Sequence, residues 1–195
     1  MKFFIDTEFM EDGRTIDLLS IGVVAEDGRE LYIEVLADAS KANAWVQANV
    51  LPHLGKIPVS TREQAARQLL DFIGPEKPEF WGYYADYDWV ALCQLFGRMI
   101  DLPSGWPMYC RDLKQLCDSV GNPSLPKQPG DEHHALADAR WVRDMHAMLS
   151  SRTASNVAAL VDAARGVLSD WDRDSLLSDC APAMDALRAA LGALR

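Results

Sequence analysis

The chain has 195 residues, 49% of them hydrophobic, and its 29 acidic and 19 basic side chains give a net charge of −10. A chain of this length can bury the core of one α/β domain but is too short for two domains that each have a sizeable core. The acidic balance disfavours a protein that grips long stretches of duplex nucleic acid, although it permits short contacts made through bound cations.

The sequence shows no signal for export or membrane insertion. The apolar start is interrupted at Asp6, and no run approaches the ~18–20 apolar residues of a membrane span. None of the four cysteines forms a Cys-x-x-Cys pair, and we interpret them as reduced, structural thiols. We therefore expect a soluble, cytoplasmic protein with no membrane partner.

Three β-strands are predicted at the start of the chain. Apolar patterns over residues 2–9, 18–25 and 31–35 are typical of strands, and a turn signal at Glu26-Asp27-Gly28 separates the second from the third. The short connections predict antiparallel order for these three strands.

Helical and strand patterns then alternate. Helices are expected at 41–51, 60–73, 87–100, 111–119 and 134–149, and strands at 79–84 and 108–110. Ser60 or Thr61 is a candidate cap of the second helix, and three prolines between 123 and 129 predict a loop before the last one. This order predicts an α/β fold with a mixed β-sheet flanked by helices, which resembles the ribonuclease-H-like fold.

The last part of the chain forms a separate helical segment in this interpretation. Two alanine- and leucine-rich amphipathic helices are predicted at 154–168 and 182–194, around a polar hinge at 169–172. They carry no residues with evident chemistry. We therefore expect a catalytic domain over 1–150 and a C-terminal helical extension over 151–195, which packs on the domain or on a second subunit.

Two acidic residues occupy the first predicted strand. Residues two apart in a strand face the same way, about 6.5–7 Å apart, so Asp6 and Glu8 project together. Carboxylates on an otherwise apolar strand are costly to bury unless they are paired or bound to a metal. The alternative is an edge strand with a solvated face.

Further acids and two histidines lie near the starts of predicted helices. Asp88, or its neighbour Asp86, opens one helix, and Asp138 follows His133 and His134 at another. We favour Asp88 because an apolar run follows it directly. Taken singly, each has an ordinary explanation: an acid at the positive end of a helix, a solvated acid, or a surface histidine.

The combination of these three segments is more specific than any one of them. Carboxylate ligands favour Mg²⁺ or Mn²⁺, and two such ions can clamp the attacking and leaving oxygens of a phosphodiester. A neutral imidazole can accept the proton of the attacking water near physiological pH. The sequence thus predicts metal-dependent phosphodiester hydrolysis.

The same residues resemble the three motifs of the DEDD superfamily of 3′→5′ exonucleases, histidine subtype. Its Asp-x-Glu, aromatic-Asp and His-x(4)-Asp motifs are matched by Asp6 and Glu8, by Tyr87-Asp88, and by His133 and Asp138. The spacing in the third motif assigns the base to the first of the two histidines.

Within the superfamily, the chain is most similar to the polyadenylate-specific exoribonucleases of the RNase AS type. The similarity is carried by residues 9–13, 20–28, 87–95 and 111–116, and it covers residues 1–148. The chain lacks the His-Asn that often leads into the second motif, where Tyr83-Tyr84 stand instead. Substrate contacts in this segment therefore do not follow from the resemblance.

The resemblance implies a metal-dependent 3′→5′ exoribonuclease that hydrolyses single-stranded RNA, with adenylate preference, to nucleoside 5′-monophosphates. Asp6, Glu8, Asp88 and Asp138 would hold two Mg²⁺ ions, for which Mn²⁺ can substitute, and His133 would activate water. A homodimer is also implied. The rival hypotheses are a proofreading-type 3′→5′ exodeoxyribonuclease and a catalytically silent binding module on the same fold.

Four residues are candidates for substrate contact. Phe9 and Met10 could pack against the terminal base, as aromatic side chains do with single-stranded ends, and core packing is the alternative for Phe9. Arg111 and Lys114 are candidates for phosphate contact, with solvated helix charges as the alternative.

Overall fold

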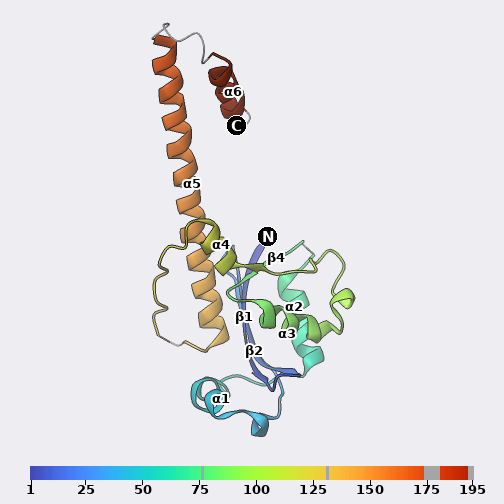
Figure 1. Cartoon of the computed structure of the whole chain (residues 1–195). Coiled ribbons are helices and arrows are strands. Elements are labelled where there is room, and N and C mark those ends of the chain that lie inside the picture. The colour runs from blue at the N-terminus through green and yellow to red at the C-terminus, as the bar shows by residue number, and fades with distance from the viewer. Residues whose placement is uncertain (76, 131, 174–180, 193–195) are drawn as a thin grey trace. The chain divides into compact units, whose positions relative to one another are not determined.

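The computed structural model describes residues 1–75, 77–130, 132–173 and 181–192 (Figure 1). The chain divides into two compact units, Met1–Ala147 and Met148–Arg195. The sheet and all the predicted site residues belong to the first unit. None of the described helices is long and apolar enough to cross a membrane.

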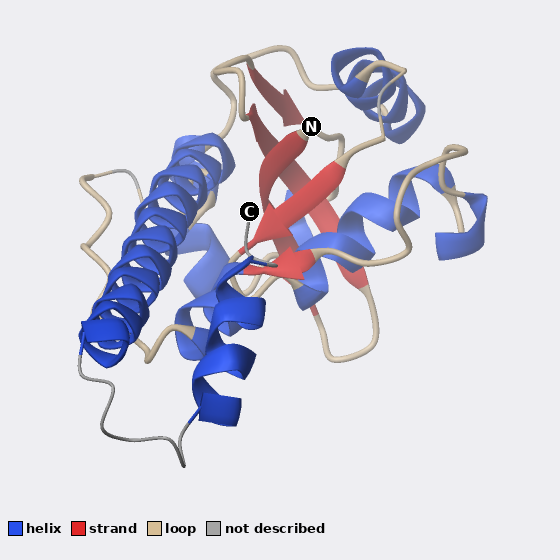
Figure 2. Cartoon of the chain, turned by 90° about the horizontal axis from the view of Figure 1, so that it is seen from above, coloured by secondary structure: helices blue, strands red, loops and turns tan. Residues whose placement is uncertain are grey.

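A five-stranded mixed sheet forms the centre of the first unit (Figures 1 and 2). Its strands are β1 (Lys2–Glu11), β2 (Ile16–Ala25), β3 (Glu30–Glu34), β4 (Glu79–Gly82) and β5 (Arg111–Asp112), in the order β3-β2-β1-β4-β5. The first three strands pair antiparallel, while β4 pairs in parallel with β1 and with β5. The predicted α/β fold, with three antiparallel strands followed by alternating helices and strands, is confirmed.

Helices α2 (Arg62–Ile73) and α3 (Asp86–Phe96) cover one face of the sheet. Thr61 caps α2 in a capping box with Gln64, because each side chain binds the other's backbone N–H. The core between these helices and the sheet consists of large apolar side chains, including Phe3, Ile5, Ile21, Leu69, Phe80 and Leu92. This buried layer fixes the odd-numbered side chains of β1 toward α3.

The opposite face receives the start of α5 (Ala135–Arg173) and, further along β1, the short helix α1 (Ala44–Asn49). Gly22 of β2 contacts the backbone of α5 so closely that an added Cβ would lie 2.3 Å from the carbonyl oxygen of Ala135. Further along α5, His146 packs on Phe4 of β1 with ring centroids 5.2 Å apart. Met10 packs into a smaller core with residues of α1.

The fifth strand and three helices differ from the prediction. The strand expected at 108–110 lies instead at Arg111–Asp112, because these residues pair with Trp81 and Gly82 of β4. Helix α3 ends at Phe96, since Gly97 adopts a φ of 116° that ends the helix. The helix expected at 41–51 is broken into 3-10 turns on either side of α1. Helix α4 (Leu113–Ser119) begins two residues later than expected.

The prediction of separate helices at 134–149 and 154–168, with a hinge at 169–172, is wrong. One helix, α5, runs without interruption from Ala135 to Arg173. No proline occurs in this stretch, and polar residues alone do not break a helix. The next helix, α6, spans Ala181–Gly192, and the last residues of the predicted 182–194 helix lie outside the described residues.

Candidate active site

Strand β1 places Asp6 and Glu8 on the face of the sheet that α5 covers. Asp6 pairs with Gly22 and Glu8 with Ser20, both on β2, and the register then shifts between Glu8 and Phe9. Because Gly22 lets the start of α5 approach the sheet, the two acids lie beside the first turn of that helix.

Asp88 reaches the same region from α3. Its Oδ1 accepts hydrogen bonds from the backbone N–H of Thr7, at 2.9 Å, and from Thr7 Oγ1, at 2.5 Å. Strand β4 pairs with β1 only along Lys2–Phe4, so the edge of β1 beyond Phe4 is open to this side chain. Asp88 is buried, whereas the alternative candidate Asp86 is exposed. Asp88, not Asp86, is therefore the acid that lies against β1.

The start of α5 supplies Asp138 and His133. Asp138 Oδ2 accepts the backbone N–H of His133 at 3.2 Å, and Gln128 donates from its side-chain amide to Asp138 Oδ1. His133 has a φ of 67°, a left-handed conformation that costs a non-glycine residue about 1–3 kcal/mol. The hydrogen bond that the His133 backbone N–H donates to Asp138 is one of the contacts that hold this strained turn.

These side chains form one acidic cluster. One potential ligand atom from each of Glu8, His133 and Asp138 lies within 4.8 Å of the other two. Burial, followed by repulsion from Asp138 and Asp88, raises the pKa of Glu8 to about 8. Burial and then the neighbouring carboxylates also raise the pKa of Asp6 well above its ordinary value.

The other two acids respond to opposing influences. Burial raises the pKa of Asp88 to about 6, although the hydrogen bonds from Thr7 favour its ionised form. Burial likewise raises the pKa of Asp138, against the stabilising hydrogen bonds from Gln128 and from the His133 backbone. Among the described residues, no lysine or arginine forms an ion pair with any of these four carboxylates. The cluster is therefore a concentration of negative charge that the described side chains leave uncompensated.

The two histidines occupy different surroundings. The ring of His133 meets Trp45 of α1 edge-on, with centroids 4.8 Å apart. The ring of His134 stacks on Tyr32 at 4.4 Å, and its Nδ1 is buried without a hydrogen-bond partner among the described residues. His133 thus faces the acids, whereas His134 packs over β3.

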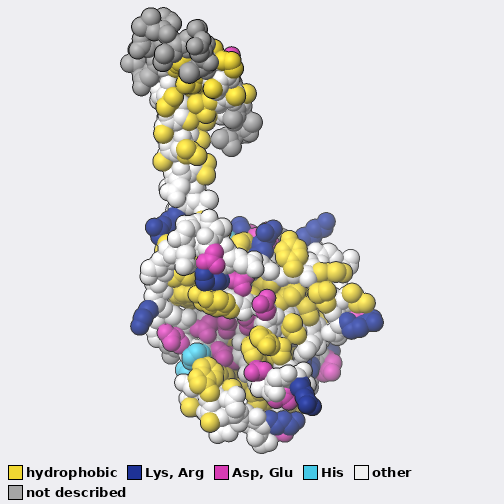
Figure 3. All heavy atoms as spheres, in the orientation of Figure 1, with side chains coloured by type: hydrophobic (Ala, Val, Ile, Leu, Met, Phe, Trp, Pro, Cys, Tyr) yellow, Lys and Arg dark blue, Asp and Glu magenta, His cyan; other side chains and the backbone are white. Residues whose placement is uncertain are grey.

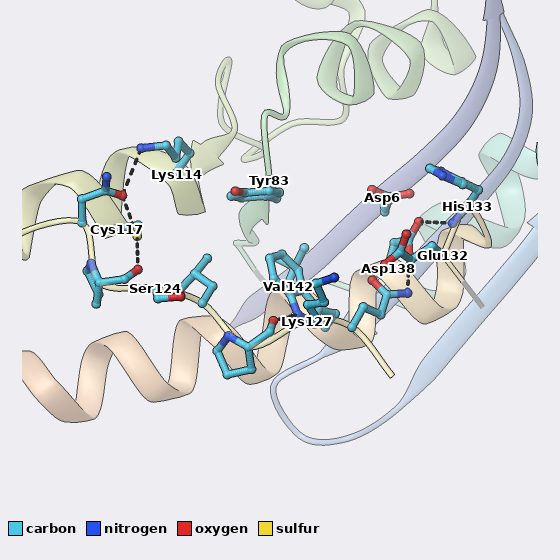
Figure 4. A pocket seen from close by; sticks show the side chains of 16 residues that line it. Asp6, Tyr83, Lys114, Cys117, Ser124, Lys127, Glu132, His133, Asp138 and Val142 are labelled. Atoms are coloured by element: carbon cyan, nitrogen blue, oxygen red, sulfur yellow. Dashed lines mark hydrogen bonds between the residues drawn. The ribbon is translucent and has the colours of Figure 1, made fainter. Parts of the chain in front are cut away.

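A cavity of about 650 Å³ opens beside the acids (Figure 4). Asp6, His133 and Asp138 line one end of it, and its walls come from α4, α5 and the proline-rich loop between them. In Figure 3, acidic side chains gather in a hollow of the first unit, with histidine and hydrophobic side chains at its border. This volume is within the ~300–1,000 Å³ of typical ligand pockets.

The predicted substrate contacts are only partly brought to this site. Phe9 stacks on Tyr87 at 5.7 Å, and Lys114 lines the cavity. Met10 is buried in the core next to α1. Arg111 is not brought to the acids, because it pairs with Glu79 at 3.4 Å and lines a different pocket.

Sequence reasoning missed three residues that shape the site. Thr7 holds Asp88, Gln128 holds Asp138, and Trp45 lies against His133. Thr7 could have been noticed because it stands between the two acids of β1. Nothing in the sequence distinguishes Gln128 or Trp45 from other loop and helix residues.

Comparison with known proteins decides the family. The profile described as the 3′-5′ exoribonuclease Rv2179c-like domain matches residues 1–149. The chain belongs to this family. This Rv2179c-like domain contains the sheet, α1 to α4 and the cavity, and it ends within α5.

Two curated relatives of the Rv2179c-like domain come from Mycobacterium tuberculosis. The 3′-5′ exoribonuclease Rv2179c of strain H37Rv is 47% identical over 148 residues, which cover 72% of this chain and 88% of the relative. The 3′-5′ exoribonuclease MT2234.1 of strain CDC 1551 / Oshkosh matches equally well. The predicted relationship to DEDD-type 3′→5′ exonucleases is therefore confirmed at the level of the family.

Solved structures with a similar fold are more distant. Escherichia coli exonuclease I in complex with a dT13 oligonucleotide superposes with a TM-score of 0.56 at 12% identity, over 82% of this chain and 43% of that one. The zinc-bound form of the E. coli ExoI–ssDNA complex gives 0.57, again at 12% identity, over 84% and 43%. These similarities support the ribonuclease-H-like nuclease fold of the Rv2179c-like domain.

Proposed function

We propose that the protein is a metal-dependent 3′→5′ exoribonuclease of the DEDD histidine subtype, which shortens single-stranded RNA and releases nucleoside 5′-monophosphates. The observation that carries the proposal is the acidic cluster itself. Four carboxylates from three separate segments converge beside one histidine at the end of an open cavity: Asp6, Glu8, Asp88 and Asp138.

Divalent cations fit this donor set. The raised pKa values of Asp6 and Glu8 reflect burial and mutual repulsion, which bound cations would relieve. Hard carboxylate oxygens favour Mg²⁺ or Mn²⁺ over softer metals. We assign the ions to the four acids, with two Mg²⁺ ions as the working stoichiometry. When bound, they supply positive charge that offsets the charge developing on the attacking and leaving oxygens.

His133 is the base in this proposal. A ring nitrogen of His133 lies within 4.8 Å of a carboxylate oxygen of Glu8 and of Asp138, and the Asp138 carboxylate accepts the His133 backbone N–H. The imidazole takes the proton of the attacking water. Attack on the terminal phosphodiester breaks the bond to the 3′ oxygen of the preceding nucleotide, so the terminal unit leaves as a 5′-monophosphate.

RNA is the favoured substrate because the relatives that share 47% of the sequence are named exoribonucleases. The E. coli exonuclease I structures contain DNA, so an exodeoxyribonuclease is the second candidate. In our proposal the terminal base packs near Phe9, whose stack on Tyr87 lies close to the acids along β1. Adenylate preference and the RNase AS assignment rest on the sequence resemblance. Met10 is buried in the small core beside α1, so we assign it no contact with the base.

One digestion panel tests the function. Poly(A), poly(U) and single-stranded DNA, each labelled at the 5′ end, are incubated with Mg²⁺, with Mn²⁺ or with EDTA. The expected result is a descending ladder on RNA that needs metal, with faster loss of poly(A) than of poly(U). Asp6→Asn should remove turnover while the circular-dichroism spectrum stays unchanged.

Each outcome of the panel bears on a different claim. Cleavage of a circular RNA, added as a fourth substrate, would refute the exonuclease assignment, and full activity in EDTA would refute the metal dependence. Faster digestion of DNA than of RNA would favour the exodeoxyribonuclease, and no hydrolysis in any lane would favour the silent binding module. Equal rates on poly(A) and poly(U) would remove only the adenylate preference.

The homodimer and the cytoplasmic location stay predictions. Light scattering coupled to size-exclusion chromatography measures the mass of the protein in solution, and a mass near 21.7 kDa would contradict the dimer.

A further inference from the structure

The cavity beside the acids extends well beyond them. In Figure 4, Asp6 and His133 lie at one end, Lys114 and Cys117 at the other, and Tyr83 between the two. Phe9, near which the terminal base is proposed to pack, is not among the lining residues. A strand whose scissile phosphate sits at the acids and whose last base lies toward Phe9 would therefore continue into this cavity.

Two lysines contribute positive charge to the cavity, although the protein as a whole carries a net charge of −10. In Figure 4, Lys114 lies at the far end and Lys127 lies nearer the acids, beside Val142. The Lys114 ammonium forms an ion pair with Asp118 and lies 3.4 Å from Asn122 Oδ1. These two contacts fix the position of the Lys114 side chain. Lys127 is exposed and forms no ion pair with any residue that the structure describes. Two cations at this place match the spaced negative charges of a nucleic-acid backbone.

Aromatic side chains line the same cavity as the two lysines. Tyr83 and Trp141 both line the cavity, and their rings meet edge-on with centroids 5.0 Å apart. The indole N–H of Trp141 donates to the carbonyl of Pro126 at 3.0 Å, which ties the proline-rich loop to α5. Aromatic rings next to cationic side chains are the usual platform for unstacked bases of single strands.

We propose that this cleft, defined by Tyr83, Lys114, Lys127 and Trp141, binds the nucleotides that precede the scissile phosphate. The inference rests on the proposed function and extends it from the reacting bond to the strand behind it. The lysines hold backbone phosphates, and the two rings contact the bases. The cleft thereby makes the enzyme prefer an oligonucleotide of several residues over a dinucleotide, although both present the same scissile bond to the acids.

The test compares oligoadenylates of two, three, five and eight nucleotides, with kcat and KM measured for each. Wild-type kcat/KM should rise with length and then level off. Lys127→Ala and Lys114→Met should remove most of this rise through KM, so that each variant loses more kcat/KM on the octanucleotide than on the dinucleotide. For the octanucleotide, each should also flatten the log–log salt dependence by ~0.7, the value for one phosphate contact with a single strand.

Lys56→Ala is the matched control. Lys56 is exposed and does not line the cavity, so this variant makes the same change in net charge without touching the cleft. Its length dependence should equal that of the wild type. Thermal melting of all variants checks that they fold.

The possible outcomes distinguish failure of the proposed cleft from failure of the proposed exonuclease activity. Wild-type protein that cleaves no oligonucleotide of any length refutes the proposed exonuclease itself. Wild-type protein that cleaves RNA without length preference overturns the cleft. So do lysine variants that slow the dinucleotide and the octanucleotide equally, or a Lys56→Ala variant that behaves like Lys127→Ala.

Discussion

Gly22 and the carbonyl of Ala135 are in direct backbone contact, and this contact sets the distance between the sheet and the first turn of α5. A Cβ on residue 22 would lie 2.3 Å from the Ala135 oxygen and 2.4 Å from the Leu136 nitrogen. Both neighbours are backbone atoms that no rotamer change can move. Because Asp6 pairs with Gly22, the same contact brings Asp138 to the acids of β1.

Gly22→Ala should therefore push the start of α5 away from the sheet. Overpacking of this kind costs about 1–3 kcal/mol in stability, and a displacement of about 1 Å at a catalytic group can cost ~10²-fold in rate. We expect a lower Tm and a turnover reduced by at least ~10-fold. Gly166→Ala is the control, since nothing lies within 4 Å of that position on α5. It should lower neither the Tm nor the turnover, because alanine favours a helix more than glycine does. Full activity of Gly22→Ala would show that the helix start does not depend on this contact.

The hydroxyl of Thr7 should control how well Asp88 serves as a metal ligand. Thr7→Val keeps the shape and removes one of two hydrogen bonds to a buried carboxylate. Loss of such a supporting contact typically lowers metal affinity ~10–100-fold. We expect the Mg²⁺ concentration for half-maximal activity to rise accordingly. Thr7→Ser, which retains the hydroxyl, should restore it, and equal Mg²⁺ requirements in all three proteins would argue against this role.

The two adjacent histidines should differ in their effect on turnover. His133→Ala should lower kcat by ~10²–10⁴-fold, the usual contribution of a general base, because only this ring faces the acids. His134→Ala should have a much smaller effect, since that ring packs on Tyr32. His133→Asn tests the backbone separately, because asparagine tolerates the left-handed conformation that His133 adopts. Should His134→Ala be the more damaging change, the assignment of the base is reversed.

Stability without metal should fall as pH rises. The folded pKa of Glu8 is about 8 against an ordinary value of 4.5, so between these values the folded state binds more protons than the unfolded state. Stability is then fully present below about pH 4.5 and is lost as the pH rises through 8. Asp88, with a folded pKa of about 6, adds to the loss at lower pH.

Melting curves in EDTA and in Mg²⁺ at several pH values measure this effect. His146 has the opposite effect on stability. Burial lowers its pKa in the folded state, so protonating this histidine at low pH destabilises the fold. The difference between EDTA and Mg²⁺ at each pH removes that contribution. The stabilisation by Mg²⁺ should grow from pH 5 to pH 8, and a difference independent of pH would contradict the buried acidic cluster.

Local pattern was sufficient for much of the fold. The period of β1, β2 and β3 and the turn at Gly28 predicted three antiparallel strands, and the alternation that followed predicted the mixed sheet. The local sequence pattern failed where a strand forms only by pairing with its neighbour, and where a helix continues because nothing ends it. Residues 111–112 become a strand only because β4 lies beside them, and α5 continues past Ser150 because nothing in its sequence ends a helix.

The sequence by itself determined which residue types the site contains. Asp6 and Glu8 had to face the same way, because the period of a strand is two, and the spacing of His133 and Asp138 had to place them at one end of a helix. Only the tertiary structure decided that Asp88 and not Asp86 meets β1, that Arg111 pairs with Glu79, and that a cavity with aromatic and lysine side chains continues from the acids. Spacing along a chain fixes directions within one element, whereas distances between elements depend on packing, here on the contact that a glycine side chain of one hydrogen allows at residue 22.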